Sequence, residues 1–176
     1  GEGGGTGEEG TTGGEGELQQ RLSDIHASYL HTNLRHLQFR SHLTHIDPSI
    51  HLFQHLTSLH LGDNKIRQLD CPLNLPLLQT LDLSGNLLTS LDFLQALSSL
   101  RSLSAARNRL SSLHLSVNML ISLPLVSLDL SQNPVCEEGL YAGEVVRALP
   151  RVRHFDGFDV EAMGGSYAHM YSGGGG

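Results

Sequence analysis

Histidine is the residue type in this chain whose number and spacing could support metal chemistry. Eight of the 11 histidines lie between His26 and His60. His51 and His55 are spaced i, i+4, and His36 and His60 are expected on neighbouring strands. A zinc site needs three or four converging ligands, and no cysteine or glutamate cluster accompanies these histidines. We therefore expect no metal and no cofactor, and we expect this half of the chain to gain positive charge below about pH 6.5.

Sequence motifs of catalysis are absent as well. The chain contains no H-E-x-x-H, no C-x-x-C, no G-x-S-x-G and no phosphate-binding loop. Serines are frequent, but none is accompanied by a histidine and an acid at a recognisable spacing. We expect that the chain is not an enzyme, although it could be the recognition segment of a larger one.

Glycine and acidic residues are concentrated at the ends of the chain. Of the 20 glycines, 15 lie in residues 1–16 and 164–176, so we expect a disordered Gly/Glu-rich tail over 1–16 and a disordered Gly-rich tail over 162–176. Apart from the five N-terminal glutamates up to Glu17, the chain carries 13 acidic residues against 11 Lys and Arg, which gives little electrostatic reason for direct nucleic-acid binding. The longest apolar-rich run, Met119–Leu128, is too short to span a membrane.

The 34 leucines recur with a fixed period. Leu34, Leu56, Leu78 and Leu100 are spaced by 22 residues, and Leu125 follows after 25. From Leu56 onward, each of these leucines opens the pattern L-x-x-L-x-L-x-x-N-x-L with few departures, which is the leucine-rich repeat signature. The alternating part predicts a short strand, and the asparagine marks the turn that follows it. We expect a structural ladder of four asparagines, namely Asn64, Asn86, Asn108 and Asn133.

The fold class predicted from this repeat is an α/β solenoid with about five repeats in a horseshoe arc. Leucines every third residue between Leu88 and Leu100 favour 3₁₀ turns, so the convex side should be mostly 3₁₀ or irregular, opposite a parallel concave sheet. In the first repeat His42 occupies the asparagine position and Leu43 comes one residue early, which predicts a distorted turn. The fourth repeat carries three extra residues within 113–123, which we expect to form a convex bulge.

Helical caps are expected at both ends of the repeat region. Residues 17–33 have apolar side chains on one face of a helix, which would cover the first repeat. The repeats then span 34–135, and a C-terminal cap spans 136–161. In this cap Glu137 and Glu138 should open a helix that Pro150 ends. The structural residues expected in the cap are Tyr141, Pro150, Phe155, Asp156 and Gly157.

The 22-residue repeats resemble those of a nuclear protein-phosphatase-1 regulator and of the axonemal dynein light chain. The order Asn133-Pro134-Val135, Tyr141, Leu149-Pro150, Val152, Phe155-Asp156-Gly157 and Val160 resembles the C-terminal leucine-rich-repeat cap motif, with Phe155 where leucine is usual. This motif is shared with the spliceosomal A-prime protein and acidic nuclear phosphoproteins. The resemblance implies an intracellular, cytoplasmic protein, with a ciliary or nuclear place as alternatives, that binds another protein.

The concave strand positions are the expected partner-binding residues. They are mostly small and polar, and they comprise His36, Gln38, Arg40, Ser58, His60, Thr80, Asp82, Ser102, Ser104, Arg107, Ser127 and Asp129. The sequence predicts a non-catalytic protein-interaction module, with a ciliary or phosphatase-directed role as the narrower expectation. A protein adaptor in a nuclear ribonucleoprotein complex is the alternative. Two other interpretations stay open. The concave face could be solvated without a partner, or the interface could lie on the convex side and the cap, including Arg147, Arg151 and Arg153.

Overall fold

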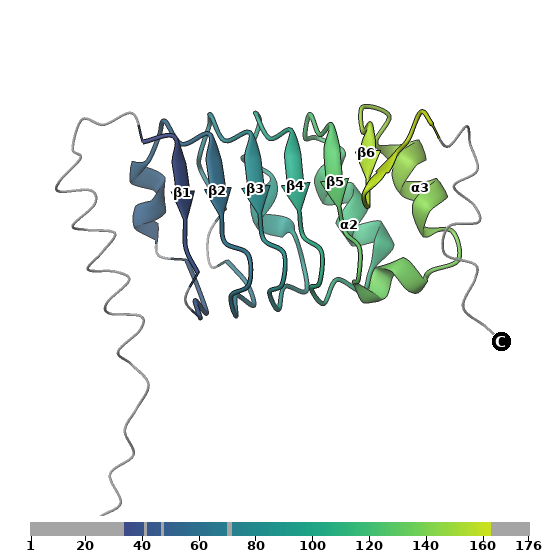
Figure 1. The fold of residues 1–176 in the computed structure, drawn as a ribbon, viewed down its shortest axis with the longest axis horizontal. Coiled ribbons are helices and arrows are strands. Elements are labelled where there is room, and N and C mark those ends of the chain that lie inside the picture. The colour runs from purple at the N-terminus through teal and green to yellow at the C-terminus, as the bar shows by residue number, and fades with distance from the viewer. Residues whose placement is uncertain (1–33, 41, 47, 70–71, 163–176) are drawn as a thin grey trace, which may run out of the picture.

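The computed structural model describes residues 34–40, 42–46, 48–69 and 72–162. In this part of the chain, short strands stand side by side in one seven-stranded sheet, and the chain winds back behind the sheet between them (Figure 1). The capping helix expected over 17–33, the tail over 1–16 and the tail from residue 163 onward lie outside the described residues.

The sheet follows the order of the sequence. Six parallel strands are followed by one antiparallel strand, β7 (Phe158–Asp159). The parallel strands are β1 (His36–Gln38), β2 (Ser58–His60), β3 (Thr80–Asp82), β4 (Ser102–Ser104), β5 (Ser127–Asp129) and β6 (His154–Phe155). Because the spacing of the first four strands equals the repeat length, Leu37, Leu59 and Leu81 pair directly with one another. The parallel sheet of a repeat solenoid is therefore confirmed.

The hydrophobic core lies between the sheet and the returning arms. The central residue of each strand from β1 to β5 points into it, as does Phe155 of β6, and all are buried: Leu37, Leu59, Leu81, Leu103, Leu128 and Phe155. In the third repeat the leucines spaced by three residues from Leu88 to Leu100 are buried as well. Each fully buried leucine contributes roughly 1.5–3 kcal/mol relative to an exposed one, so the repeats are stable only when stacked.

The convex side contains short 3₁₀ turns in most repeats. They are η1 (Pro48–Leu52), η2 (Asp92–Leu94) and η3 (Pro134–Glu137). A 22-residue repeat leaves little length for the return arm, and 3₁₀ turns accommodate apolar residues every third position. The expectation of a mostly 3₁₀ or irregular convex side holds for these repeats.

The fourth repeat departs from that expectation. Its three extra residues form no bulge but allow an α-helix, α2 (Leu113–Leu120), behind the sheet (Figure 1). Leu113, Val117 and Leu120 lie on one face of this helix and are buried. Ser112 caps it, because its side chain accepts a hydrogen bond from the Leu115 N–H at 3.4 Å. The prediction of a bulge was wrong because the buried apolar residues of this segment are spaced i, i+4, i+7, which favours an α-helix over the 3₁₀ turns that a spacing of three favours.

The helix of the C-terminal cap begins later than expected. Glu137 ends the turn η3, and α3 (Tyr141–Ala148) begins four residues after it. Glu138 instead links the cap to α2, because its Oε1 accepts a hydrogen bond from the Leu113 N–H at 3.1 Å. The helix ends before Leu149, in agreement with the restriction that Pro150 places on the preceding residue. No helix in the described part of the chain is long and apolar enough to cross a membrane.

The turn of the first repeat is shorter than the others. His42 has a positive φ of 48°, and Leu43 follows it directly. The Leu43 N–H donates to Asn64 Oδ1 at 3.1 Å, just as the Ile66 N–H donates to Asn86 Oδ1 at 3.0 Å. Leu43 therefore takes the place of Ile66 in a turn that has lost one residue, and this is the distortion expected from the sequence.

Candidate functional site

Two rows of outward-facing residues cross the concave face of the sheet. The register of the strands aligns the first position of each strand in one row, formed by His36, Ser58, Thr80, Ser102 and Ser127. The third positions form the other row, with Gln38, His60, Asp82, Ser104 and Asp129. The structure thus brings ten of the twelve predicted concave residues together on one face.

Ser58 differs from the other members of these rows because it is buried. It is only 7% exposed, whereas Thr80 and Ser102 at the same position are half-buried. Its hydroxyl lies 2.8 Å from His60 Nε2, so the imidazole two residues along the strand shields it. Ser58 therefore offers little surface of its own on the concave face, and its role in partner binding stays a prediction.

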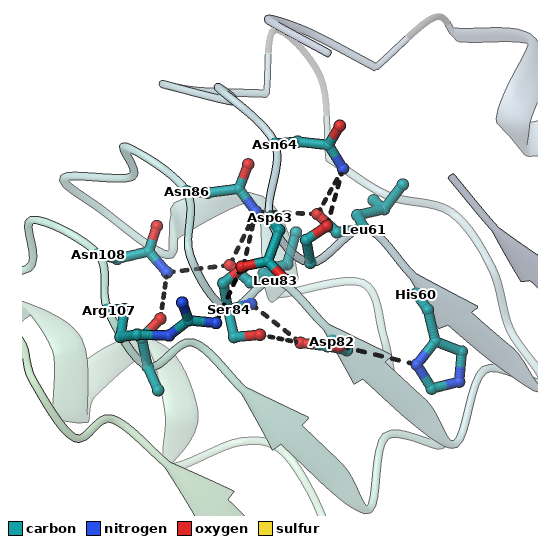
Figure 2. A network of polar contacts seen from close by, with 12 residues as sticks. His60, Leu61, Asp63, Asn64, Asp82, Leu83, Ser84, Asn86, Arg107 and Asn108 are labelled. Carbon is teal, nitrogen blue, oxygen red and sulfur yellow. Dashed lines mark hydrogen bonds and ion pairs between the residues drawn. The ribbon is translucent and has the colours of Figure 1, made fainter. Parts of the chain in front are cut away.

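Asp82 belongs to a local network (Figure 2). Its Oδ1 accepts hydrogen bonds from the backbone N–H and the hydroxyl of Ser84, at 3.0 and 2.7 Å. Its Oδ2 lies 3.8 Å from His60 Nδ1 on the neighbouring strand. Asp129 repeats the arrangement with Ser131, at 3.0 and 2.7 Å. Each aspartate thus holds the turn after its strand with one oxygen and leaves the other toward the concave side.

The two predicted arginines lie beyond the strands rather than on them. Arg40 follows β1. When the side-chain amide of Gln38 is oriented with its oxygen toward Arg40, this oxygen accepts a hydrogen bond from the Arg40 Nε at 2.8 Å. Arg107 lies in the turn after β4 and has a positive φ of 54°. Its guanidinium pairs with the Asp63 carboxylate at 2.9 Å, although the two residues are 44 positions apart (Figure 2).

The Asp63–Arg107 pair passes over Gly85. All three residues occupy the same turn position of successive repeats, and each has a positive φ. A Cβ atom on Gly85 would meet the Asp63 carboxylate and lie 3.2 Å from the Arg107 guanidinium. This pair was not predicted from the sequence. The signal was opposite charges at equivalent positions two repeats apart, with a glycine between them.

The asparagine ladder lies beside this turn and is fully hydrogen-bonded. Asn86 Nδ2 donates to the carbonyl oxygens of Leu61 and Leu83, both at 2.9 Å, while its Oδ1 accepts from the Ile66 N–H. Equivalent bonds are made by Asn64, Asn108 and Asn133. Each side chain therefore joins its own repeat to the preceding one, which fixes the turns from which Arg107 and Asp63 project.

The C-terminal cap closes the sheet with a carboxylate. Asp156 Oδ1 accepts from the Leu130 N–H at 2.7 Å, and its Oδ2 accepts from the Tyr141 hydroxyl at 2.9 Å. In the preceding repeats the residue equivalent to Leu130 donates to a carbonyl oxygen of the next strand. Tyr141 and Phe155 are buried with ring centroids 5.4 Å apart, and Gly157 has a φ of 84° in the turn to β7. Pro150, also predicted for the cap, is exposed after α3.

Two buried groups of the cap have raised pKa values. Burial, reinforced by the negative charge of Asp156, raises the pKa of Tyr141 far above the usual tyrosine range. Burial also raises the pKa of the Cys136 thiol, although a backbone hydrogen bond from Asn133 opposes the effect. Both groups therefore stay protonated at neutral pH, and they stabilise the cap without offering a nucleophile. Among the described residues, no group of three or more His, Cys, Asp or Glu side chains converges as a metal site would require.

The architecture defines a class of protein: a solenoid whose repeats each supply one strand, one asparagine and one leucine-lined return arm. Residues 54–96 match the family model described as Leucine Rich repeats (2 copies). With the repeat pattern and the fold, this match shows that the chain is a leucine-rich repeat protein.

The chain is similar to several solved structures. The crystal structure of the Drosophila melanogaster SNF/U2A' complex aligns with a TM-score of 0.64 and 24% identity, over 76% of this chain and 78% of that chain. The internalin inlF of Listeria monocytogenes aligns with a TM-score of 0.44 and 22% identity, over 68% of this chain and 38% of that one. Internalin C2 of the same organism gives a TM-score of 0.41 and 19% identity, over 86% and 80% of the two chains. No curated protein sequence matches the chain.

Proposed function

We propose that the chain is a non-catalytic protein-interaction module that binds its partner on the concave face. One observation carries the proposal: five strands align two rows of mostly exposed or half-exposed polar side chains, and no other described element covers them. Leucine-rich repeats in general are protein-interaction modules, which supports the coarser part of the proposal.

The chemistry of the face indicates what kind of partner fits it. The residues are mostly small and polar, and none is Phe, Tyr or Trp, so the partner has to supply the large apolar anchors that dominate interface energies. The first and fifth strands are four strand spacings apart, or about 19 Å. A helix of about 13 residues has that length. A partner helix with a few basic residues would lie along both rows and reach Asp129 and the Asp82 carboxylate beside His60.

We place the chain inside the cell, in the cytoplasm, with a ciliary or nuclear site as alternatives. The support is the resemblance of the repeats and of the cap to intracellular proteins, and a phosphatase-directed or axonemal role would follow from the same resemblance. A role as the recognition segment of a larger enzyme is compatible with the same face, since the module itself would supply binding only.

The alternative function is that of a protein adaptor in a nuclear ribonucleoprotein complex. Its support is the order of cap residues from Asn133 to Val160, together with the fold shared with the U2A' protein of the SNF/U2A' complex. In this alternative the chain would bind the protein component. The two described rows of the concave face contain no Phe, Tyr or Trp for stacking on RNA bases.

The proposal is tested by blocking the face without touching the core. Partners would be purified on the tagged full chain from its source cells and identified by mass spectrometry. The chief partner would then be tested against Ser102→Arg, which places a large side chain in the first row on β4. Ser111→Arg is the matched control, because Ser111 is exposed and outside both rows.

We expect Ser102→Arg to abolish capture of the partner while Ser111→Arg retains it, with both variants melting like the parent chain. A second pair, Asp82→Asn with Asp129→Asn, removes charge but keeps an oxygen that can accept from Ser84 and Ser131. If Ser102→Arg retains the partner and only Arg151→Ala with Arg153→Ala loses it, the concave face is not the interface.

A further inference from the structure

Two grooves adjoin each other at the C-terminal end of the solenoid, outside the concave rows. The first has a volume of about 450 Å³ and lies where the chain leaving α2 meets the end of α3. Buried leucines at positions 123, 125 and 149 form its apolar lining, and Ile121, which is 56% exposed, stands at its rim. Pro150 and Arg151 line this groove and the second one alike.

The second groove is basic. It has a volume of about 560 Å³ and contains the side chains of Arg101, Arg151 and Arg153. Glu161 also lines it and pairs with Arg153 at 2.8 Å. Within the described part of the chain, no carboxylate lies within ion-pair distance of Arg101 or Arg151. Two exposed guanidinium groups therefore stand beside an apolar groove without a compensating charge.

This combination selects the chemistry of an occupant. The leucine-lined groove accommodates an aliphatic side chain, and the guanidinium groups bind carboxylates through paired N–H donors. A nucleic acid would use the arginines as well, but single-stranded nucleic acid also relies on aromatic side chains on which its bases stack, and neither groove contains one. The charge and the apolar lining together favour a peptide in which leucine-like residues are followed by acidic ones.

We propose that these adjoining grooves form a second protein-binding site, which takes an extended acidic-apolar peptide segment of a partner protein. Its aliphatic side chains occupy the groove beside Ile121, and its carboxylates pair with Arg151 and Arg101. The lining residues of this site lie outside the two concave rows, so it does not depend on the function proposed for them.

The experiment measures fluorescence anisotropy of a labelled peptide with two leucines followed by four glutamates, added to the full chain. Arg151→Glu and Ile121→Ser should each weaken binding by about tenfold or more, since one reverses the charge and the other removes the apolar rim. Arg109→Glu and Leu115→Ser are the matched controls. Both residues are exposed and lie outside the grooves, and both variants should bind the peptide like the parent chain.

Other outcomes overturn the proposal. Absence of peptide binding to the parent chain does so, and so does an equal loss with Arg109→Glu, which would indicate attraction to net charge alone. Tighter binding of an oligouridine than of the peptide would assign the grooves to nucleic acid. A tenfold gain in peptide affinity after deletion of residues 1–17 would show that the chain's own acidic segment is the occupant. Sedimentation that shows a dimer broken by Ile121→Ser would assign the grooves to a second copy.

Discussion

Asn86 shows how one side chain stabilises two repeats. Its amide nitrogen donates to two carbonyl oxygens in neighbouring turns, and its oxygen accepts from a backbone N–H, all within the buried interior. Backbone groups left without partners in such a place are costly, because water cannot replace the lost bonds.

We expect Asn86→Ala to lower the free energy of unfolding by about 3–5 kcal/mol, since it leaves several buried backbone groups unpaired. Urea denaturation followed by circular dichroism measures the loss. The control is Asn118→Ala on α2, because Asn118 is exposed and bonds only His114. This control should stay within about 0.5 kcal/mol of the parent chain. Equal losses in the two variants would contradict the ladder.

Gly85 and Gly143 should respond to alanine in opposite directions. Gly85 has a φ of 64° and lies under the Asp63–Arg107 pair, so Gly85→Ala should cost about 1–2 kcal/mol. Gly143 lies in α3 with open space around it, so Gly143→Ala should stabilise by about 0.5–1 kcal/mol. Thermal melts measure both. In an Asp63→Ala background, Gly85→Ala should cost only the strain of a positive φ, because the steric conflict with Asp63 is gone. An unchanged cost would show that the Asp63–Arg107 pair does not contribute to the effect of Gly85→Ala.

At the scale of elements, the C-terminal cap replaces the strand that a further repeat would have provided. Asp156 accepts the N–H of Leu130, which would otherwise face a missing neighbour, and Tyr141 holds the same carboxylate from α3. The buried Asp156 side chain therefore joins α3 to the end of β5. Ionisation of Tyr141 would disturb this link, so it would affect the stability of the whole cap.

The raised pKa of Tyr141 predicts alkaline instability. Above about pH 10 the unfolded chain ionises this tyrosine, while the folded chain keeps it protonated, so the folded state binds more protons. The free energy of unfolding should then fall by about 1.4 kcal/mol per pH unit from this group. Denaturant titrations between pH 8 and pH 11 measure the slope.

Tyr141→Phe is the control for this pH dependence. It removes the hydroxyl bond to Asp156, so it should cost about 1–2 kcal/mol at pH 8. It also removes the ionisable group, so the difference from the parent chain should shrink as the pH rises above 10. A constant difference across this range would show that Tyr141 ionises equally in both states.

Elements whose positions follow from the repeat period could be predicted from the sequence. Features that depend on local conformational preferences or side-chain orientation could not. The strands, their register and the asparagine positions follow from the 22-residue spacing of leucines. The helix α2 was missed because a leucine spacing of three is ambiguous until the extra residues supply a helical face. The burial of Ser58 depends on where the His60 ring lies, and no spacing encodes that orientation.

At the scale of the whole molecule, stability depends on contact between neighbouring repeats. Each repeat shares hydrogen bonds and core leucines with the repeats before and after it, and the cap covers the last one. Segments that cover an end of the solenoid should therefore contribute more to its stability than segments that add nothing to the core.

Deletion of residues 1–16 should leave the melting temperature nearly unchanged, because a Gly/Glu/Thr segment has no apolar surface to bury. Deletion from His154 onward should lower it by about 10 °C or more, or cause aggregation. That truncation removes the buried Phe155 ring and the Asp156 bonds that close β5. Differential scanning calorimetry on both truncations is the measurement, and equal melting temperatures would contradict the role of the cap.

The parallel sheet also determines how the molecule would respond to mechanical load. Its strands lie across the long axis of the solenoid, so the hydrogen bonds between them run along that axis. A pull along the axis would open one pair of strands at a time instead of shearing all pairs together. Each 22-residue repeat that detaches would release roughly 75 Å of extended chain. Tethered by its two ends, the protein would lengthen in steps and act as an extensible spring.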